Sequence, residues 1–168
     1  MPDIDLPLAG VHAAVAELVA AAERLEIAWT KPRAPGEWSP SQIVEHVARI
    51  MEESANVASN RPSKFPTVPF FVRPIARILV FKRTLWRNAF PKMKAIAAFV
   101  PAAGSATPAD GRVRLHGALA SFDQACRVRA ASGQDVASSI FGNVPVADFA
   151  TFQELHIRHH ILQMPGAA

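Results

Sequence analysis

Residues 37–50 read EWSPSQIVEHVARI, a stretch that contains the start of a helix and a histidine within it. Ser39 and Gln42 have the spacing of a capping box, in which the two residues satisfy each other's backbone N–H groups. Pro40 falls at the first helical position, where its fixed φ suits the helix and its missing N–H is not needed. We therefore predict a helix that begins after Ser39 and continues to about Ala58.

His46 lies in this helix between Ile43 and Ile50, on the face that should turn inward. The pattern calls for a hydrophobic residue there, and a buried polar group needs a partner to offset its desolvation. A lone histidine in such a place is most often a core residue bonded to a carbonyl group. His46 by itself therefore predicts no site.

A second informative stretch, QELHIRHHILQM, covers residues 153–164 and is predicted to form the last helix. His156 and His160 are four residues apart and lie on one helical face, together with Phe149 and Phe152. A divalent metal would satisfy both imidazoles at about 2.0–2.1 Å. The spacing alone is weak, because the glutamate of the HExxH zinc-protease motif is missing.

Taken together, His46, His156 and His160 are the predicted ligands of one divalent metal ion. Three imidazoles leave at least one coordination position open, which is typical of a catalytic rather than a structural site. Three imidazoles suit zinc, nickel, copper or iron, of which we expect zinc or nickel. From the residues alone, three ordinary core histidines stay an open alternative.

Other titratable residues receive simpler interpretations. His159 lies at the edge of the inward face, where it would line a pocket or bond a partner of a ligand histidine. His12 and His116 are interpreted as ordinary helix residues. Three acidic residues are interpreted as parts of a solvated helix face, with a role as general base or ligand support as the alternative: Glu45, Glu52 and Glu53.

The whole chain predicts an all-α fold in a single domain over residues 1–168, with four main helices and one long crossover between the second and third. Asp110 and Asp148 are expected to cap the last two main helices. The stretch IFGNVPV, residues 140–146, comes nearest to a strand but is short. The main helices are expected at 6–29, 39–58, 110–133 and 149–164, with an irregular segment at 60–72, a further helix at 73–88 and a short helical piece up to Val100.

Composition limits the function classes. Of the 168 residues, 50% are hydrophobic and one is a cysteine, Cys126, so no intramolecular disulfide can form. The N-terminus is acidic, unlike a secretory signal, and no run of about 18 uncharged apolar residues predicts a transmembrane helix. A soluble, cytoplasmic protein is expected.

Charge is unevenly distributed along the chain. Residues 61–94 hold nine of the eighteen basic residues and none of the fourteen acidic ones, which gives this segment a formal charge of +9 and the remainder −5. Such a block on an acidic body favours a local anionic partner. No recognition motif accompanies the charge, so nucleic-acid binding is not expected.

The two histidine-bearing stretches together resemble the DinB/YfiT-like superfamily. EWSPSQIVEHVARI is similar to its second-helix segment, where a Trp-Ser run precedes the first ligand, and QELHIRHHILQM is similar to its last helix, with H-x-x-H-H-x-x-Q. The resemblance implies a four-helix bundle and, by position, metal ligands at His46, His156 and His160. Members include thiol-dependent S-transferases, a thiol-dependent isomerase and proteins of no known activity. This chain departs from them in its basic 61–94 segment and in having no tyrosine.

The functional expectations form a short series. The first is a metal-dependent enzyme that transfers groups with a low-molecular-weight thiol and acts on a small-molecule substrate, anionic in character. The alternatives are a metal-dependent hydrolase and a non-catalytic binding module. Peripheral membrane association of the basic segment is disfavoured, because its apolar and basic residues do not separate into clean helical faces. A homodimer is the expected assembly.

Overall fold

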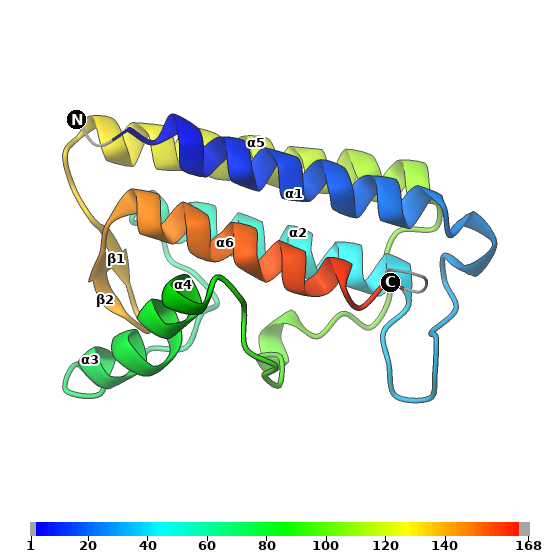
Figure 1. Cartoon of the computed structure of the whole chain (residues 1–168), viewed down its shortest axis with the longest axis horizontal. Coiled ribbons are helices and arrows are strands. Elements are labelled where there is room, and N and C mark those ends of the chain that lie inside the picture. The colour runs from blue at the N-terminus through cyan, green and yellow to red at the C-terminus, as the bar shows by residue number, and fades with distance from the viewer. Residues whose placement is uncertain (1–2, 165–168) are drawn as a thin grey trace.

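The computed structural model of the chain describes residues 3–164, which are mostly helical. Four long helices lie side by side in two layers, with α1 above α6 and α5 above α2 (Figure 1). The contacts are most extensive between α2 and α5 and between α1 and α6, and both pairs enclose apolar side chains. Their bounds are α1 (Asp5–Glu23), α2 (Pro40–Ala58), α5 (Pro108–Ala131) and α6 (Val146–Ile161).

Helix α1 is the most apolar of the long helices. Among the described residues it is the one helix whose length and composition would allow it to cross a membrane, a test that core helices also pass. Leu8, Val11, Val15 and Leu18 are completely buried against the rest of the bundle. The expected helix over 6–29 is shorter than predicted, because α1 ends at Glu23 and only a 3-10 turn, η1 (Glu26–Ala28), follows.

Helix α2 begins as predicted. The Gln42 backbone N–H donates to Ser39 Oγ at 3.3 Å, and the Ser39 N–H donates to Gln42 Oε1 at 3.0 Å, which completes the capping box. The Gln42 side-chain amide also donates to the carbonyl of Pro101, so the same cap ties the helix to the later crossing segment. The start of α2 and its inward face are thereby fixed relative to residues 99–102.

The chain between α2 and α5, residues 59–107, crosses the bundle. Its helical part is continuous and consists of α3 (Arg73–Ala76), the π-helical turn η2 (Arg77–Lys82) and α4 (Arg83–Arg87), which confirms the helix expected at 73–88. The helix ends at Asn88, whose φ of 49° is left-handed. The further helix expected up to Val100 is wrong except for one 3-10 turn, η3 (Ala97–Phe99), because Pro91 and an extended stretch intervene.

Two expected helix caps are also wrong. Helix α5 is capped by Thr107, whose Oγ1 accepts from the Asp110 N–H at 3.1 Å, so Asp110 stands in the first turn instead of before it. Helix α6 starts at Val146 after Pro145, and Asp148 lies in its first turn without a capping bond. Helix α5 begins earlier because Thr107 caps it and Pro108 takes the first helical position, and in both helices the aspartate lies in the first turn, where a carboxylate is also favourable.

A two-stranded antiparallel hairpin is added to the otherwise helical fold, which agrees with the all-α expectation in the rest of the described residues. Strands β1 (Val136–Ser138) and β2 (Gly142–Val144) pair with Val136 opposite Val144. Both valines are fully buried, so the hairpin closes the end of the core between α5 and α6. The stretch 140–146 that came nearest to a strand in the sequence contains β2.

Candidate metal centre

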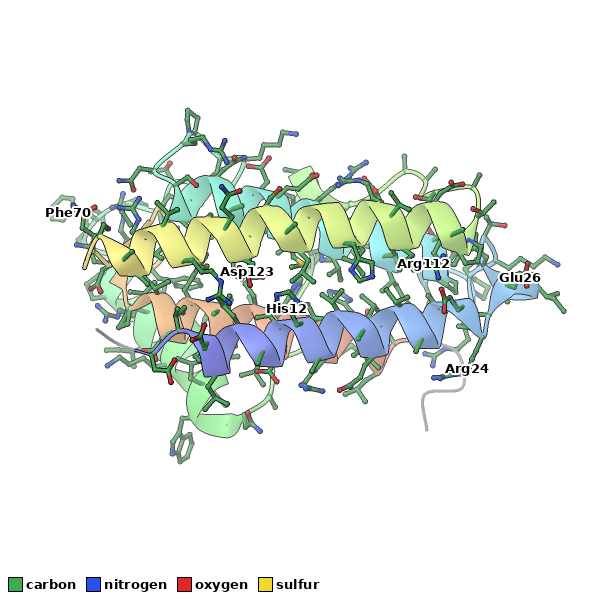
Figure 2. All side chains as sticks on the ribbon, turned by 90° about the horizontal axis from the view of Figure 1, so that it is seen from above. His12, Arg24, Glu26, Phe70, Arg112 and Asp123 are labelled. Carbon is green, nitrogen blue, oxygen red and sulfur yellow. The ribbon has the colours of Figure 1, made fainter. Side chains whose placement is uncertain are left out.

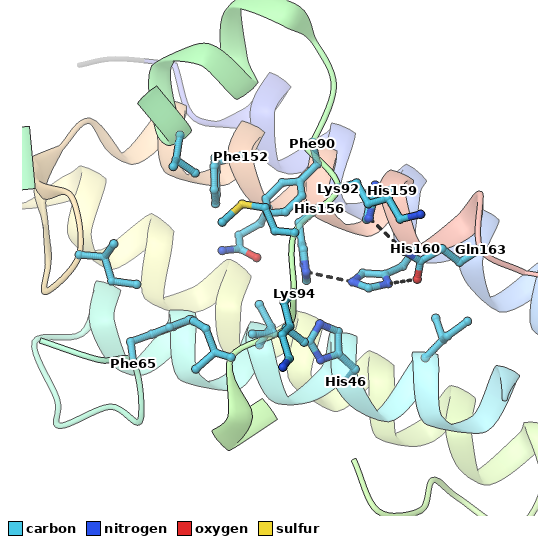
Figure 3. Close-up of a pocket in the computed structure, with 18 of the residues that line it drawn as sticks. His46, Phe65, Phe90, Lys92, Lys94, Phe152, His156, His159, His160 and Gln163 are labelled. Carbon is cyan, nitrogen blue, oxygen red and sulfur yellow. Dashed lines mark hydrogen bonds between the residues drawn. The ribbon is translucent and has the colours of Figure 1, made fainter. Parts of the chain in front are cut away.

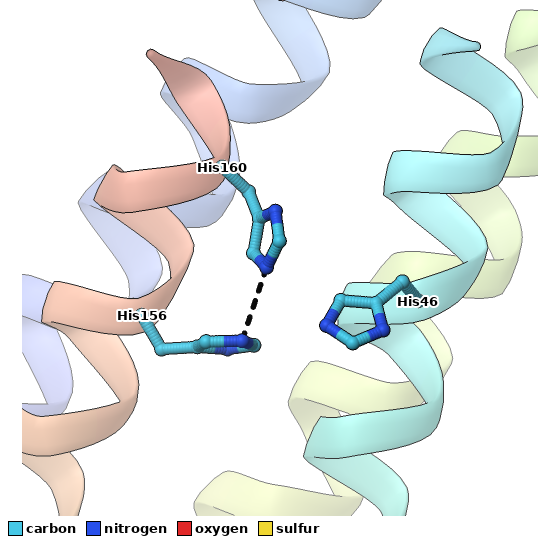
Figure 4. Close-up of side chains that lie close together, drawn as sticks. All are labelled: His46, His156 and His160. Carbon is cyan, nitrogen blue, oxygen red and sulfur yellow. Dashed lines mark hydrogen bonds between the residues drawn. The ribbon is translucent and has the colours of Figure 1, made fainter. Parts of the chain in front are cut away.

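Three buried histidines converge between α2 and α6. His46 projects from α2, and His156 and His160 project from successive turns of α6 (Figure 4). One ring nitrogen from each lies within 4.8 Å of the others, and the Nε2 atoms of His156 and His160 are 3.1 Å apart. Residues far apart in the sequence therefore form one compact group of nitrogen ligands that could hold a metal ion.

Hydrogen bonds orient two of the three rings. His46 Nδ1 lies 2.8 Å from the carbonyl oxygen of Phe99, and since a carbonyl only accepts, Nδ1 donates and Nε2 carries the free lone pair. His160 Nδ1 likewise donates to Gln163 Oε1 at 2.9 Å, which leaves its Nε2 as the acceptor. Fixing the tautomer through the distal nitrogen is the usual arrangement around metal-binding histidines.

The third ring has an unsatisfied atom. His156 Nδ1 is buried and has no hydrogen-bond partner among the described residues, while its Nε2 faces His160 Nε2. Burial lowers the pKa of His156 well below its usual value and that of His160 to about 3, and it also lowers the pKa of His46. All three rings are therefore neutral near pH 7, the form in which imidazole binds a metal.

The donor set fits a divalent ion. With nitrogen–metal bonds of about 2.0–2.1 Å, two cis ligand nitrogens stand roughly 2.8–3.4 Å apart for octahedral and tetrahedral geometry. The 3.1 Å separation of the Nε2 atoms of His156 and His160 falls in that range. Among the described residues no carboxylate or thiolate joins the group, so an ion here would keep its full positive charge and open positions.

A cavity of about 650 Å³ opens beside the three rings (Figure 3). This size suits a small molecule, for which cavities of about 300–1,000 Å³ are usual. Its walls are mainly apolar and aromatic. The ring centroid of Phe90 lies 5.0 Å from that of His156 and 5.2 Å from that of Phe152. The histidines thus lie in the wall of a pocket and not in a closed core.

Polar groups in the cavity wall are few. Gln153, 3% exposed, donates from its amide nitrogen to Ser54 Oγ at 3.0 Å, and its Oε1 has no partner among the described residues. Lys92 and Lys94 are exposed and also line the cavity, which therefore reaches the surface beside two cations. A ligand would meet positive charge at the edge and a free amide oxygen inside.

Of the other three histidines considered from the sequence, one lies at the cavity and two lie away from it. His159 lines the cavity, and its Nε2 accepts from the amide of Gln163, the residue that orients His160, so both suggested roles apply. His12 pairs with Asp123 on the surface and His116 is exposed on α5, away from the cavity.

The three glutamates considered as bases or ligand supports also lie outside the cavity lining. Glu45 and Glu52 pair with Arg114, and Glu53 accepts from the backbone N–H of Lys64. The Glu52 side chain is 43% exposed, as expected for a solvated helix face, whereas the side chains of Glu45 and Glu53 are only 13% and 12% exposed.

Sequence reasoning missed several contributors to the site. Gln153 lies three residues before His156, on the same helical face, and this spacing was a usable signal. Trp38, to which no role at the site was assigned, places its ring 4.7 Å from that of His46. The contact of His46 with the backbone carbonyl of Phe99 could not be predicted from the sequence, because every residue has a carbonyl group.

Comparisons with known proteins give one result. The family described as "Protein of unknown function (DUF1569)" matches residues 11–165, nearly the whole chain and both histidine-bearing helices. No curated protein and no solved structure matches the chain. Because the match extends over far more than half of its length, the chain belongs to the DUF1569 family.

Proposed function

We propose that this protein is a metal-dependent enzyme that holds one divalent ion, zinc or nickel, with His46, His156 and His160, and transfers groups with a small thiol. The observation that carries the proposal is the convergence of three neutral, buried imidazoles on one wall of a 650 Å³ cavity. The resemblance of both ligand-bearing stretches to the DinB/YfiT-like superfamily, with its four-helix bundle and thiol-dependent members, supports it further. A cytoplasmic location goes with this proposal.

The residues around the site suit a thiol and an apolar electrophile. A divalent ion with neutral ligands lowers the pKa of a thiol or water at its open position. Lys92 and Lys94 attract an anionic co-substrate to the edge of the cavity. Phe90 and Phe152 hold the apolar part of the electrophile beside the histidines, and Gln153 Oε1 accepts a hydrogen bond from a substrate N–H or O–H.

The cavity favours a thiol nucleophile over water. Metal-dependent hydrolysis commonly uses a nearby carboxylate as general base. Among the residues that line the cavity, the one carboxylate is Glu37, which is held by Arg33 through two bonds of 2.8 and 2.9 Å. A thiol with a lowered pKa ionises without such a base. Hydrolysis and simple binding are the competing outcomes of the assays.

The metal site is tested by elemental analysis of protein purified without an affinity tag. The parent is expected to hold about one ion per chain, and His46→Ala, His156→Ala and His160→Ala to lose stoichiometric binding. His12→Ala and His116→Ala are matched controls, since both histidines lie on helices away from the cavity. Equal metal content in all five variants would sink the assignment.

The reaction is tested by incubating the metal-loaded protein with a panel of thiols and chlorodinitrobenzene as a generic electrophile. Conjugation that requires both metal and thiol supports group transfer. Cleavage of a nitrophenyl ester without thiol would replace it with hydrolysis. If neither occurs, and thiols leave the spectrum of the cobalt-substituted protein unchanged, the protein is a binding module.

A further inference from the structure

The helix of the crossing segment and the turn before it carry a row of large apolar side chains that the bundle does not cover. Phe70 is 79% exposed and Trp86 is 82% exposed, although both are aromatic. Residues 75, 78, 79 and 86 follow helical spacing along one side of the helix, and Phe70 and Phe71 lie in the turn before it. We call this set the exposed strip, and its members are Phe70, Phe71, Ile75, Ile78, Leu79 and Trp86.

The opposite side of the same helix packs on the bundle. Phe81 and Thr84 are buried, and Val80 lines the cavity beside the histidines. A membrane role was disfavoured from the sequence because the apolar and basic residues of this segment do not separate into clean helical faces. The structure accounts for this distribution, since one apolar face is used by the core and the other, the exposed strip, is left over.

Exposed cations flank the strip. Lys82, Arg83 and Arg87 are exposed on or next to α4, and none of them forms an ion pair within residues 3–164. The surrounding segment 61–94 has a formal charge of +9, against −5 for the rest of the chain. An anionic surface would therefore orient the molecule with this helix toward it.

We propose that the exposed strip and its cations bind the surface of an anionic lipid bilayer, with the helix lying in the plane of the interface. Aromatic side chains interleaved with Lys and Arg on one helix are the composition that interfacial helices use. This inference rests on the strip and its flanking cations and is independent of the chemistry proposed for the metal site.

Other occupants account for less of what is observed. A nucleic acid would satisfy the cations but leave six large apolar side chains in water. A symmetric dimer through this face would bring the same cationic patch against itself, since an isologous interface repeats one surface. No member of the strip lines the cavity at the histidines, so the strip is not the floor of that pocket.

The first test is flotation of the full-length, metal-loaded protein with vesicles. We expect binding to vesicles of equal parts phosphatidylglycerol and phosphatidylcholine, weakening with salt, and no binding to phosphatidylcholine alone. The triple variant Lys82→Gln/Arg83→Gln/Arg87→Gln should lose about a hundredfold in partition, at about fivefold per cation. Phe70→Ser/Phe71→Ser should lose roughly tenfold or more, because its two aromatic rings no longer leave water.

Matched controls come from the other end of the molecule. Arg24 and Glu26 lie at the end of the bundle opposite Phe70 (Figure 2). Arg24→Gln/Lys31→Gln removes exposed charge there, and Ile27→Ser removes a side chain that is 93% exposed. Both controls should bind vesicles as the parent does, and circular dichroism should show the same helicity in every variant.

Tryptophan fluorescence gives an independent readout. Trp29 is buried and Trp38 half-buried, so a blue shift of emission on adding anionic vesicles reports Trp86, and Trp86→Phe should abolish the shift while binding persists. The inference is overturned if the folded parent does not float with anionic vesicles at low salt. It is also overturned if the control variants lose vesicle binding as much as the test variants do. Two further outcomes would overturn it by identifying another occupant of the strip. A DNA duplex that competes with vesicles and binds Phe70→Ser/Phe71→Ser unchanged would indicate a nucleic acid, and a change from dimer to monomer as the only effect of that variant would indicate a second copy of the chain.

Discussion

Replacing His156 with leucine should separate the stability of the metal-free protein from its response to metal. In the parent, His156 Nδ1 is buried without a partner, whereas its Nε2 bonds His160 Nε2 at 3.1 Å. Leucine, which is similar in size, removes one unsatisfied buried atom but leaves His160 Nε2 without its partner. An unsatisfied buried polar atom costs about 1–3 kcal/mol, so the two effects offset each other.

The metal-free variant is therefore expected to unfold within about 1 kcal/mol of the parent. For a chain of 168 residues this corresponds to less than about 4 °C in Tm. The metal response is much larger, because an ion at a hundred times its Kd stabilises the folded state by about 2.7 kcal/mol, or roughly 5–10 °C. His156→Leu should lose this increment in stability, because only two of the three predicted ligands remain.

The assay is thermal unfolding of chelator-treated protein with and without added zinc or nickel, followed by circular dichroism. His116→Leu serves as the control because His116 is exposed on α5, and both its metal-free Tm and its metal increment should match the parent. The reasoning is refuted if His156→Leu keeps the full increment. If metal-free His156→Leu loses more than about 3 kcal/mol in its free energy of unfolding, His156 is an ordinary packed core residue.

Three further predictions concern single groups. Gln163→Leu should weaken metal binding roughly 10–100-fold without removing a ligand, because His160 loses the acceptor that orients its ring, and competition with a zinc chelator would show this. The contribution of His160 to the stability of the metal-free protein should fall by about 2 kcal/mol between pH 7 and pH 5, as measured by urea unfolding at each pH. Burial lowers the pKa of His160 in the folded protein to about 3, below its value in the unfolded chain. The stabilisation is therefore present above about pH 6.5 and falls at lower pH, where the unfolded state takes up the proton. Cys126, whose pKa burial raises to about 12, should resist iodoacetamide at pH 8 in the folded protein and react within minutes in denaturant, which mass spectrometry would detect.

Helix boundaries and the grouping of side chains were predictable wherever local chemistry determines them. The Ser39–Gln42 capping box and Pro40 specify the start of α2 within four residues, and the structure has both capping bonds. The pairing of His156 with His160 follows from the helical repeat alone. That the structure brings His46 to the same place could be expected only from its inward phase and from family resemblance, since no local rule joins α2 to α6. Metal binding itself stays a prediction.

The errors have identifiable causes. Thr107–Pro108 repeats the Ser39–Pro40 arrangement and could have been recognised as the start of α5, whereas Asp110 was the more familiar capping residue. The hairpin at 136–144 was missed because its strands are three residues long, too short for an alternating pattern to stand out. Tertiary packing of Val136 and Val144 stabilises it, and packing is not visible in a local window.

The crossing segment contributes to both the candidate metal cavity and the exposed strip, which local sequence could not predict. Its Phe99 carbonyl orients His46, its Lys92 and Lys94 stand at the edge of the cavity, and its helix places Val80 in the cavity wall. The same helix exposes Leu79 on its other side, one residue away. The proposed lipid-facing surface and the candidate metal cavity therefore lie back to back on a single helix. A protein held at a bilayer by this helix would carry its cavity directly above the interface, where apolar small molecules concentrate.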